Sequence, residues 1–114
     1  MNRDSKIYLA GHDGLVGSAI YRELIDQGYN NIVTRKFTEL DLRDQSATED
    51  FFKIMKPDYV FFCAAKVGGI IANSSYKAEF IYDNIMIAAN VIHSSWEYGV
   101  KKLLNLGSSC VYPK

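Results

Sequence analysis

The sequence has no long apolar run and no excess of charge of either sign. Its apolar stretches are shorter than the roughly 20 residues that cross a membrane, so we expect no membrane partner. Thirteen Lys and Arg residues balance thirteen Asp and Glu residues. Because the charge is balanced, nothing indicates a nucleic-acid partner. The polar N-terminus also lacks the pattern of a secretory signal.

Cysteine is scarce as well, and its placement excludes two further classes. Cys63 and Cys110 are the two cysteines, they lie far apart, and neither has the spacing of a metal-ligand set. We therefore expect no metal site and a reduced, cytoplasmic protein. The chain also lacks repeats, low-complexity tracts and linkers. Its 114 residues, 48% of them hydrophobic, fit one modest globular domain.

Three evenly spaced glycines organise the sequence. The apolar run Ile7 to Ala10 leads directly into Gly11, Gly14 and Gly17, and a helical pattern follows. This order of strand, glycine turn and helix is typical of a dinucleotide-binding site. The first glycine permits a sharp turn, the second leaves room for a pyrophosphate, and the third allows close packing of helix on strand. The alternative is a tight strand-to-helix turn without a ligand.

Strands and helices alternate along the rest of the chain. Hydrophobic periodicity predicts helices that are stopped by Gly28, by Pro57 and by Gly99. Asp44 or Ser46 is expected to cap the second of them. The predicted helices are Leu15 to Gln27, Ser46 to Met55 and Tyr76 to Tyr98, and the predicted strands are Ile7 to Ala10, Ile32 to Thr34, Tyr59 to Ala65 and Leu103 to Leu106.

This alternation predicts an α/β protein with a Rossmann-type parallel sheet and helices on both faces. We expect the first four strands of such a sheet, in the spatial order 3-2-1-4. A sheet that stopped there would expose an apolar edge strand. We therefore expect residues 1–114 to be the N-terminal part of a dinucleotide-binding domain.

Two cationic residues occupy the positions that distinguish NAD binding from NADP binding. About twenty positions beyond the glycines, an NAD-binding fold has a carboxylate for the ribose hydroxyls, whereas this sequence has Arg35 and Lys36. Cations there suit the 2′-phosphate of NADP, although a pair of solvated charges is the alternative. Asp13 opposes the NADP interpretation because its carboxylate would repel that phosphate. Asp41 is either a contact to the adenine or a turn residue.

Small residues follow the third and fourth predicted strands. Ligands bind beyond the carboxyl ends of parallel strands. Ser108, Ser109 and Cys110 therefore lie where a substrate would meet a nicotinamide. A serine can donate a hydrogen bond to a carbonyl, and a cysteine can exchange a proton with a carbon acid. We interpret Cys63 as a packing residue and assign no role to His93.

Three segments together resemble the GDP-L-fucose synthase family of extended short-chain dehydrogenase/reductases. The segments are Gly11 to Gly17, Ala64 to Gly69 and Gly107 to Lys114. The resemblance extends over the whole chain but covers only the N-terminal portion of a family member. It implies a Rossmann fold, a GDP-sugar substrate and a homodimer.

The resemblance also implies chemistry. Members of the family epimerise GDP-4-keto-6-deoxymannose at carbons 3 and 5 and reduce its 4-keto group with NADPH. By motif, Ser108 hydrogen-bonds the keto oxygen and Cys110 acts in the epimerisation. The implied cofactor-binding residues are Gly11, His12, Asp13, Gly14, Leu15, Val16, Gly17, Arg35, Asp41, Leu42, Ala64, Ala65 and Lys66. The implied substrate-binding residues are Val67, Gly68, Gly69, Ser108, Ser109 and Cys110.

The sequence departs from the family pattern in two respects. Asp13 and Phe37 stand where members often have arginines near the 2′-phosphate. The family's Tyr-x-x-x-Lys pair and its histidine do not occur after Cys110 in these 114 residues. We therefore expect the chain by itself to be inactive.

Two functional alternatives remain open. The chain is either a segment of such an enzyme or a non-catalytic nucleotide-binding module, and another NAD(P)-dependent sugar-nucleotide epimerase or dehydratase would also fit. The long third helix leaves a structural alternative, because its apolar residues cover more than one face. They are either all buried within the chain, or one stripe contacts the same helix of a second subunit.

Overall fold

The chain forms an α/β fold in which strands and helices alternate. The computed structural model describes residues 1–64 and 74–105, and gives the backbone alone for residues 74–78 and residue 80. The elements in this part of the chain are β1 (Ile7–Ala10), α1 (Leu15–Asp26), β2 (Ile32–Val33), α2 (Gln45–Met55), β3 (Tyr59–Phe62), α3 (Ser74–Glu97) and β4 (Lys102–Asn105). The predicted α/β class is confirmed.

The strands form one parallel sheet in the order β2-β1-β3-β4. The predicted order 3-2-1-4 is therefore wrong. It placed the fourth strand beside the first, whereas β3 pairs with all four residues of β1 and β4 lies beyond β3. The apolar residues of β3 explain its central place, since Val60 and Phe62 are 0% and 5% exposed and need cover from neighbours. The short, half-buried β2 suits an edge.

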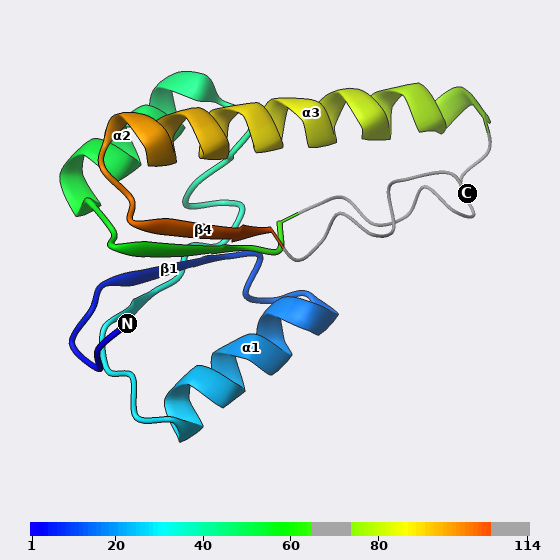
Figure 1. The fold of residues 1–114 in the computed structure, drawn as a ribbon. Helices are drawn as coiled ribbons and strands as arrows, with labels where there is room; N and C mark the ends of the chain where they lie inside the picture. The colour runs from blue at the N-terminus through cyan, green and yellow to red at the C-terminus, as the bar shows by residue number, and fades with distance from the viewer. Residues whose placement is uncertain (65–73, 106–114) are drawn as a thin grey trace.

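Helices cover both faces of the sheet, as predicted. The connection from β1 to β2 runs toward one edge, while the two later connections run the opposite way. Because parallel crossovers are right-handed, this reversal places α1 on one face and both α2 and α3 on the other. Figure 1 shows this division, with α1 alone on its side of the sheet.

The helix ends follow the local signals in the sequence to within two residues. Asp44 caps α2 by accepting a hydrogen bond from the backbone N–H of Ala47 at 3.1 Å. Lys56 then ends α2 in a left-handed conformation, with φ of 45°. Gly28 and Gly99, which follow α1 and α3, also have positive φ. Of the helices in the described ranges, none is both long and apolar enough to cross a membrane.

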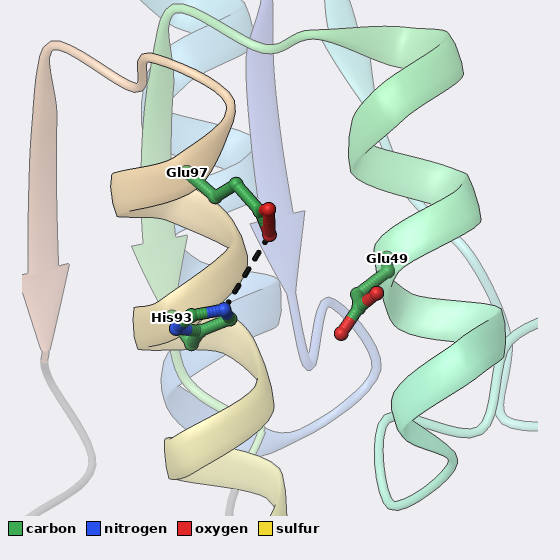
Figure 2. A group of neighbouring side chains, drawn as sticks. All are labelled: Glu49, His93 and Glu97. Carbon is green, nitrogen blue, oxygen red and sulfur yellow. Dashed lines mark ion pairs between the residues drawn. The ribbon is translucent and has the colours of Figure 1, made fainter.

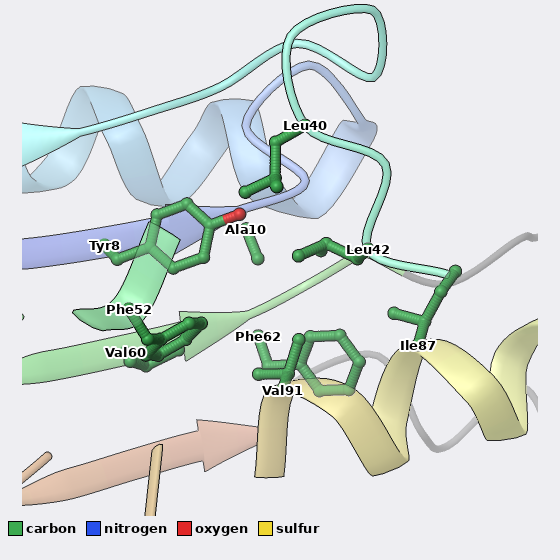
Figure 3. Packing of buried hydrophobic residues seen from close by; sticks show 9 residues of the cluster. All are labelled: Tyr8, Ala10, Leu40, Leu42, Phe52, Val60, Phe62, Ile87 and Val91. Atoms are coloured by element: carbon green, nitrogen blue, oxygen red, sulfur yellow. The ribbon is translucent and has the colours of Figure 1, made fainter. Parts of the chain in front are cut away.

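The main core lies between the sheet and the α2–α3 layer. Alternate residues of β1 and β3 point to this side and meet side chains from both helices and from the loop before α2 (Figure 3). The cluster consists of Tyr8, Ala10, Leu40, Leu42, Phe52, Val60, Phe62, Ile87 and Val91. Phe51 and Phe52 both pack against the ring of Tyr8, with centroids 4.5 and 5.8 Å away. Burial raises the pKa of Tyr8 strongly, and the nearby positive charge of Arg35 opposes that rise.

Candidate nucleotide-binding site

The glycine turn connects β1 directly to the N-terminus of α1. Gly11 follows the strand with φ of 84°, a conformation that favours glycine. The backbone N–H of Gly14 donates to the carbonyl of Gly11 at 3.2 Å. Gly14 is the N-cap residue, and it has no side chain that could cap the first N–H groups of α1. The positive end of the helix dipole therefore meets solvent at this turn.

The three glycines have different neighbours. A Cβ on Gly11 would lie 2.7 Å from the backbone of Cys63 and Ala64, and a Cβ on Gly17 would overlap the carbonyl oxygen of Gly11. These two glycines are thus required by the packing of β1, β3 and α1 on one another. A Cβ on Gly14 would meet only the Gly11 oxygen, at an ordinary 3.7 Å. The residues that the structure describes leave open space at Gly14.

The other residues of the turn are more exposed. Asp13, Gly14, Leu15 and Val16 all face solvent, and Leu15 is 90% exposed. His12 is half-buried, and its Nδ1 has no hydrogen-bond partner among the described residues. These positions leave the surface around the N-terminus of α1 accessible to a ligand.

Arg35 lies just beyond β2, at the same edge of the sheet as the glycine turn. Its guanidinium donates to the carbonyl of Thr34 at 2.8 Å and stacks 5.4 Å from the centre of the Phe51 ring. The side chain is half-buried, whereas Lys36 is exposed. The Thr34 contact uses one of the five N–H donors of an arginine. Arg35 is therefore held in place by the protein and can still face an anion.

Asp41 and Leu42 lie in the loop before α2, where both make contacts within the chain. The Asp41 carboxylate accepts two hydrogen bonds from Arg43, from Nε at 3.0 Å and from Nη2 at 2.9 Å. Arg43 also pairs with Asp83 of α3 at 3.5 Å and lies over the Phe37 ring at 5.0 Å. The cofactor role of Asp41 stays a prediction, and the structure shows that Arg43 orients its carboxylate.

The backbone of Leu42 is tethered to α3. The side chain of Leu42 packs in the core, and its carbonyl accepts a hydrogen bond from Asn90 Nδ2 at 2.8 Å. Sequence reasoning missed both Arg43 and Asn90. The available signals were an Asp-x-Arg pair in a turn and two asparagines in a largely apolar helix, and none of them identifies its partner.

The remaining predicted site residues divide into two groups. Ala64 belongs to the part of the chain that the structure describes. It is half-buried, and its backbone lies close to Gly11. Cys63 beside it is also half-buried, and burial raises the pKa of its thiol, which fits a packing role. The residues outside the described part are Ala65, Lys66, Val67, Gly68, Gly69, Ser108, Ser109 and Cys110.

The parallel sheet and the strand–glycine–helix turn define a Rossmann-type fold of the nucleotide-binding class. Residues 7–114 match the NAD dependent epimerase/dehydratase family, and the chain belongs to that family.

Individual relatives agree with this assignment. The chain is 58% identical over 113 residues to GDP-L-fucose synthase 1 of Arabidopsis thaliana, covering 99% of the chain and 35% of that protein. It is 51% identical over 109 residues to GDP-L-fucose synthase of Escherichia coli K12, covering 96% of the chain and 34% of that protein. The chain thus spans about a third of the length of these curated relatives.

A solved structure gives the same result for the fold. MlghC, the GDP-mannoheptose C4 reductase of Campylobacter jejuni with NADP bound, superimposes with a TM-score of 0.86 at 47% identity. The superposition covers 92% of this chain and 33% of that one.

Proposed function

We propose that the glycine turn binds the pyrophosphate of NADP(H). The observation that carries this proposal is the difference between the three glycines. Packing among the described residues explains Gly11 and Gly17, whereas it does not explain the open space at Gly14. An anion there would meet the uncapped N–H groups and the positive end of α1. The NADP bound to the Campylobacter jejuni reductase supports this choice of ligand.

Arg35 is the proposed contact to the 2′-phosphate. It is held against Phe51 at the edge of the sheet where the turn lies, and a charge-assisted hydrogen bond from its guanidinium would distinguish NADPH from NADH. The proposed cofactor contacts of Asp41, Leu42, Ala64, Ala65 and Lys66 rest on their motif positions.

The proposed reaction is that of the relatives named as GDP-L-fucose synthases. In this proposal the chain is the cofactor-binding segment of an epimerase and reductase of GDP-4-keto-6-deoxymannose, acting in nucleotide-sugar metabolism in the cytoplasm. Ser108 donates a hydrogen bond to the keto oxygen. Cys110 exchanges the proton beside the keto group, as an isomerase step requires. Fractionation of cells that express the protein tests its location.

A titration with NADPH tests the cofactor site. Asparagine is a preferred N-cap residue, so Gly14→Asn should keep the fold while its side chain fills the open space. We expect the variant to lose NADPH binding and to keep the circular dichroism spectrum of the original protein. Unchanged NADPH affinity in the folded variant would show that the turn binds no pyrophosphate.

Arg35→Ala tests the choice between the two cofactors. NADPH affinity should fall by about 1–3 kcal/mol, the usual contribution of a hydrogen bond to a charged group, while NADH affinity should hardly change. Arg22→Ala removes the same charge from an exposed position on α1 and is the matched control. Equal losses for NADPH and NADH in Arg35→Ala would argue against a 2′-phosphate contact.

The alternatives differ in their reaction with substrate. Substrate-dependent NADPH oxidation with GDP-4-keto-6-deoxymannose, measured on the complete polypeptide that contains these residues, supports the epimerase and reductase. Turnover of a different nucleotide sugar favours another epimerase or dehydratase. NADPH binding without any turnover favours a non-catalytic module.

A homodimer formed through α3 is the second part of the proposal. Ile81, Ile85, Ile92 and Trp96 recur along one side of the helix and are 48%, 60%, 46% and 77% exposed. Their spacing makes a stripe about 22 Å long at 1.5 Å per residue, and exposed apolar stripes of this kind mark interaction surfaces. The same helix of a second copy presents a matching stripe.

Sedimentation equilibrium tests the dimer. Ile85→Asp places a charge in the centre of the stripe and should convert a dimer to a monomer. Ile54→Asp adds the same charge at a 77% exposed position on α2 and should leave the dimer intact. A monomeric original protein, or equal dissociation by both variants, would contradict this part of the proposal.

A further inference from the structure

Helices α2 and α3 bring together three side chains that are able to bind a metal ion. Glu49 comes from α2, and His93 and Glu97 come from α3 (Figure 2). One ligand atom from each of the three residues lies within 4.8 Å of the others. The group lies on the opposite face of the sheet from α1, so the proposed cofactor site does not account for it.

The packing of the two helices creates this arrangement. His93 and Glu97 are four residues apart and therefore share one side of α3. Their contact is direct, with His93 Nε2 lying 3.4 Å from Glu97 Oε2. Glu49 extends from α2 toward the same point, as Figure 2 shows. Gln45 orients the Glu49 carboxylate, since its Nε2 donates to Glu49 Oε2 at 2.9 Å.

We propose that Glu49, His93 and Glu97 form a binding site for a zinc ion. Ligand atoms about 2.1 Å from a tetrahedral zinc ion lie about 3.4 Å from one another. The His93–Glu97 distance already has this value, and a carboxylate oxygen of Glu49 lies within 4.8 Å of both ligand atoms. One imidazole and two carboxylates favour zinc over magnesium or calcium, which prefer oxygen ligands alone.

An ordinary helical ion pair explains only part of the arrangement. His93 and Glu97 alone form such a pair. The pair by itself gives no reason for a second carboxylate to approach. Two carboxylates that share a site repel each other unless a cation lies between them. A divalent ion between the carboxylates would remove that repulsion, and the ligand atoms of the three residues lie close enough together to share one ion.

The space beside the trio provides a second, independent observation. Glu49 and His93 border a cavity of about 320 Å³ between the helices. Ser94 also lines this cavity, is only 1% exposed, and its hydroxyl has no hydrogen-bond partner in the described parts of the chain. A water occupies about 30 Å³, so the cavity has room for water ligands of the ion.

The single tryptophan of the chain is a built-in reporter for this site. The Trp96 ring lies 6.0 Å from the His93 ring, between His93 and Glu97 in sequence. Zinc chloride is titrated into the 114-residue chain in the Cys63→Ser, Cys110→Ser background, so that thiols do not compete. Trp96 fluorescence reports on the site, and calorimetry gives the stoichiometry. We expect saturable binding of one zinc ion per chain and no response to magnesium.

Three single variants test the assignment in that background. His93→Ala and Glu49→Gln should each weaken zinc binding about 10-fold to 100-fold, a range that loss of an orienting partner alone can reach. Glu79→Gln removes an exposed carboxylate from α3 outside the trio and should leave zinc binding unchanged. Equal affinity in all three variants, or no zinc binding in the parent, would overturn the proposal. NADPH affinity is measured in the same samples, and it should not depend on zinc.

Discussion

The two faces of the sheet differ in how completely they are covered. On the α2–α3 face, the Phe52, Val60 and Val91 side chains are fully buried between the sheet and two helices. The opposite face is covered by α1 alone. There Ile7 and Leu9 of β1 are buried, but Leu15 and Ile25 of the helix are 90% and 49% exposed.

This difference means that one face of the sheet provides stability and the other is available for ligand binding. The α2–α3 face contains the contiguous core and therefore provides most of the hydrophobic stabilisation. The α1 face exposes the glycine turn and the N-terminus of the helix, which a ligand needs to reach. We expect substitutions on the first face to change the free energy of unfolding and those at the turn to change binding.

The largest expected difference between the two faces is in the free energy of unfolding after one large apolar residue on each face is replaced. Phe52→Ala leaves a cavity beside Tyr8 and should lower the free energy of unfolding by about 3–5 kcal/mol. Leu15→Ala removes a 90% exposed side chain and should change it by less than about 0.5 kcal/mol. Urea unfolding followed by circular dichroism measures both values. Similar losses would mean that Leu15 is covered in solution.

The glycine turn allows a comparison within a single helix end. Helix propensity alone predicts that Gly17→Ala stabilises α1 by about 1 kcal/mol. The overlap with the Gly11 carbonyl predicts the opposite sign, with a loss of about 1–3 kcal/mol or more. Gly14→Ala should stay within about 1 kcal/mol, because it changes only the N-cap. A stabilised Gly17→Ala in urea unfolding would contradict the close contact of α1 with the turn.

Asn90 links the core face to the loop of the predicted cofactor site. Asn90→Ala leaves the buried carbonyl of Leu42 without its 2.8 Å hydrogen bond and should destabilise the protein by about 1–3 kcal/mol. Asn30→Ala, at an exposed turn, is the matched control and should have little effect. Equal midpoints of thermal unfolding in the two variants would show that the tether contributes nothing.

The smallest expected effect concerns Cys63, which directly follows the last residue of β3. Burial raises the pKa of its thiol, so less thiolate is present than in a free cysteine at pH 8. Alkylation by iodoacetamide, followed by mass spectrometry of the Cys63 peptide, should be slower in the native chain than in the unfolded chain. As pH rises above about 8.5, the unfolded thiol ionises first and stability should decrease. Equal alkylation rates would mean that Cys63 is exposed.

Much of the fold could be predicted because the deciding signals are local. The glycine spacing, the cap at Asp44 and the stops at Gly28 and Gly99 act through neighbouring residues, and the helices end within two residues of the predicted positions. The strand order was predicted wrongly. It depends on which apolar strand pairs with β1, and β3 is separated from β1 by about fifty residues of chain.

The candidate site also has one part that could be predicted from the sequence and another part that could not. The turn from Gly11 to Gly17 could be recognised from spacing, because a strand, a sharp turn and a helix occupy consecutive residues. The contact of Arg43 with Asp83 and the tether from Asn90 to Leu42 join residues 40 and 48 positions apart. No pattern in the sequence identifies such pairs.

The sequence by itself determined where the helices and strands form and which glycines make the turn, because backbone conformation and capping depend on neighbouring residues. Tertiary structure alone decided that Gly14 faces open space, that β3 lies beside β1 and that Glu49 meets His93 and Glu97. Each of these depends on how the sheet and helices pack, and packing brings together side chains that the chain itself keeps far apart.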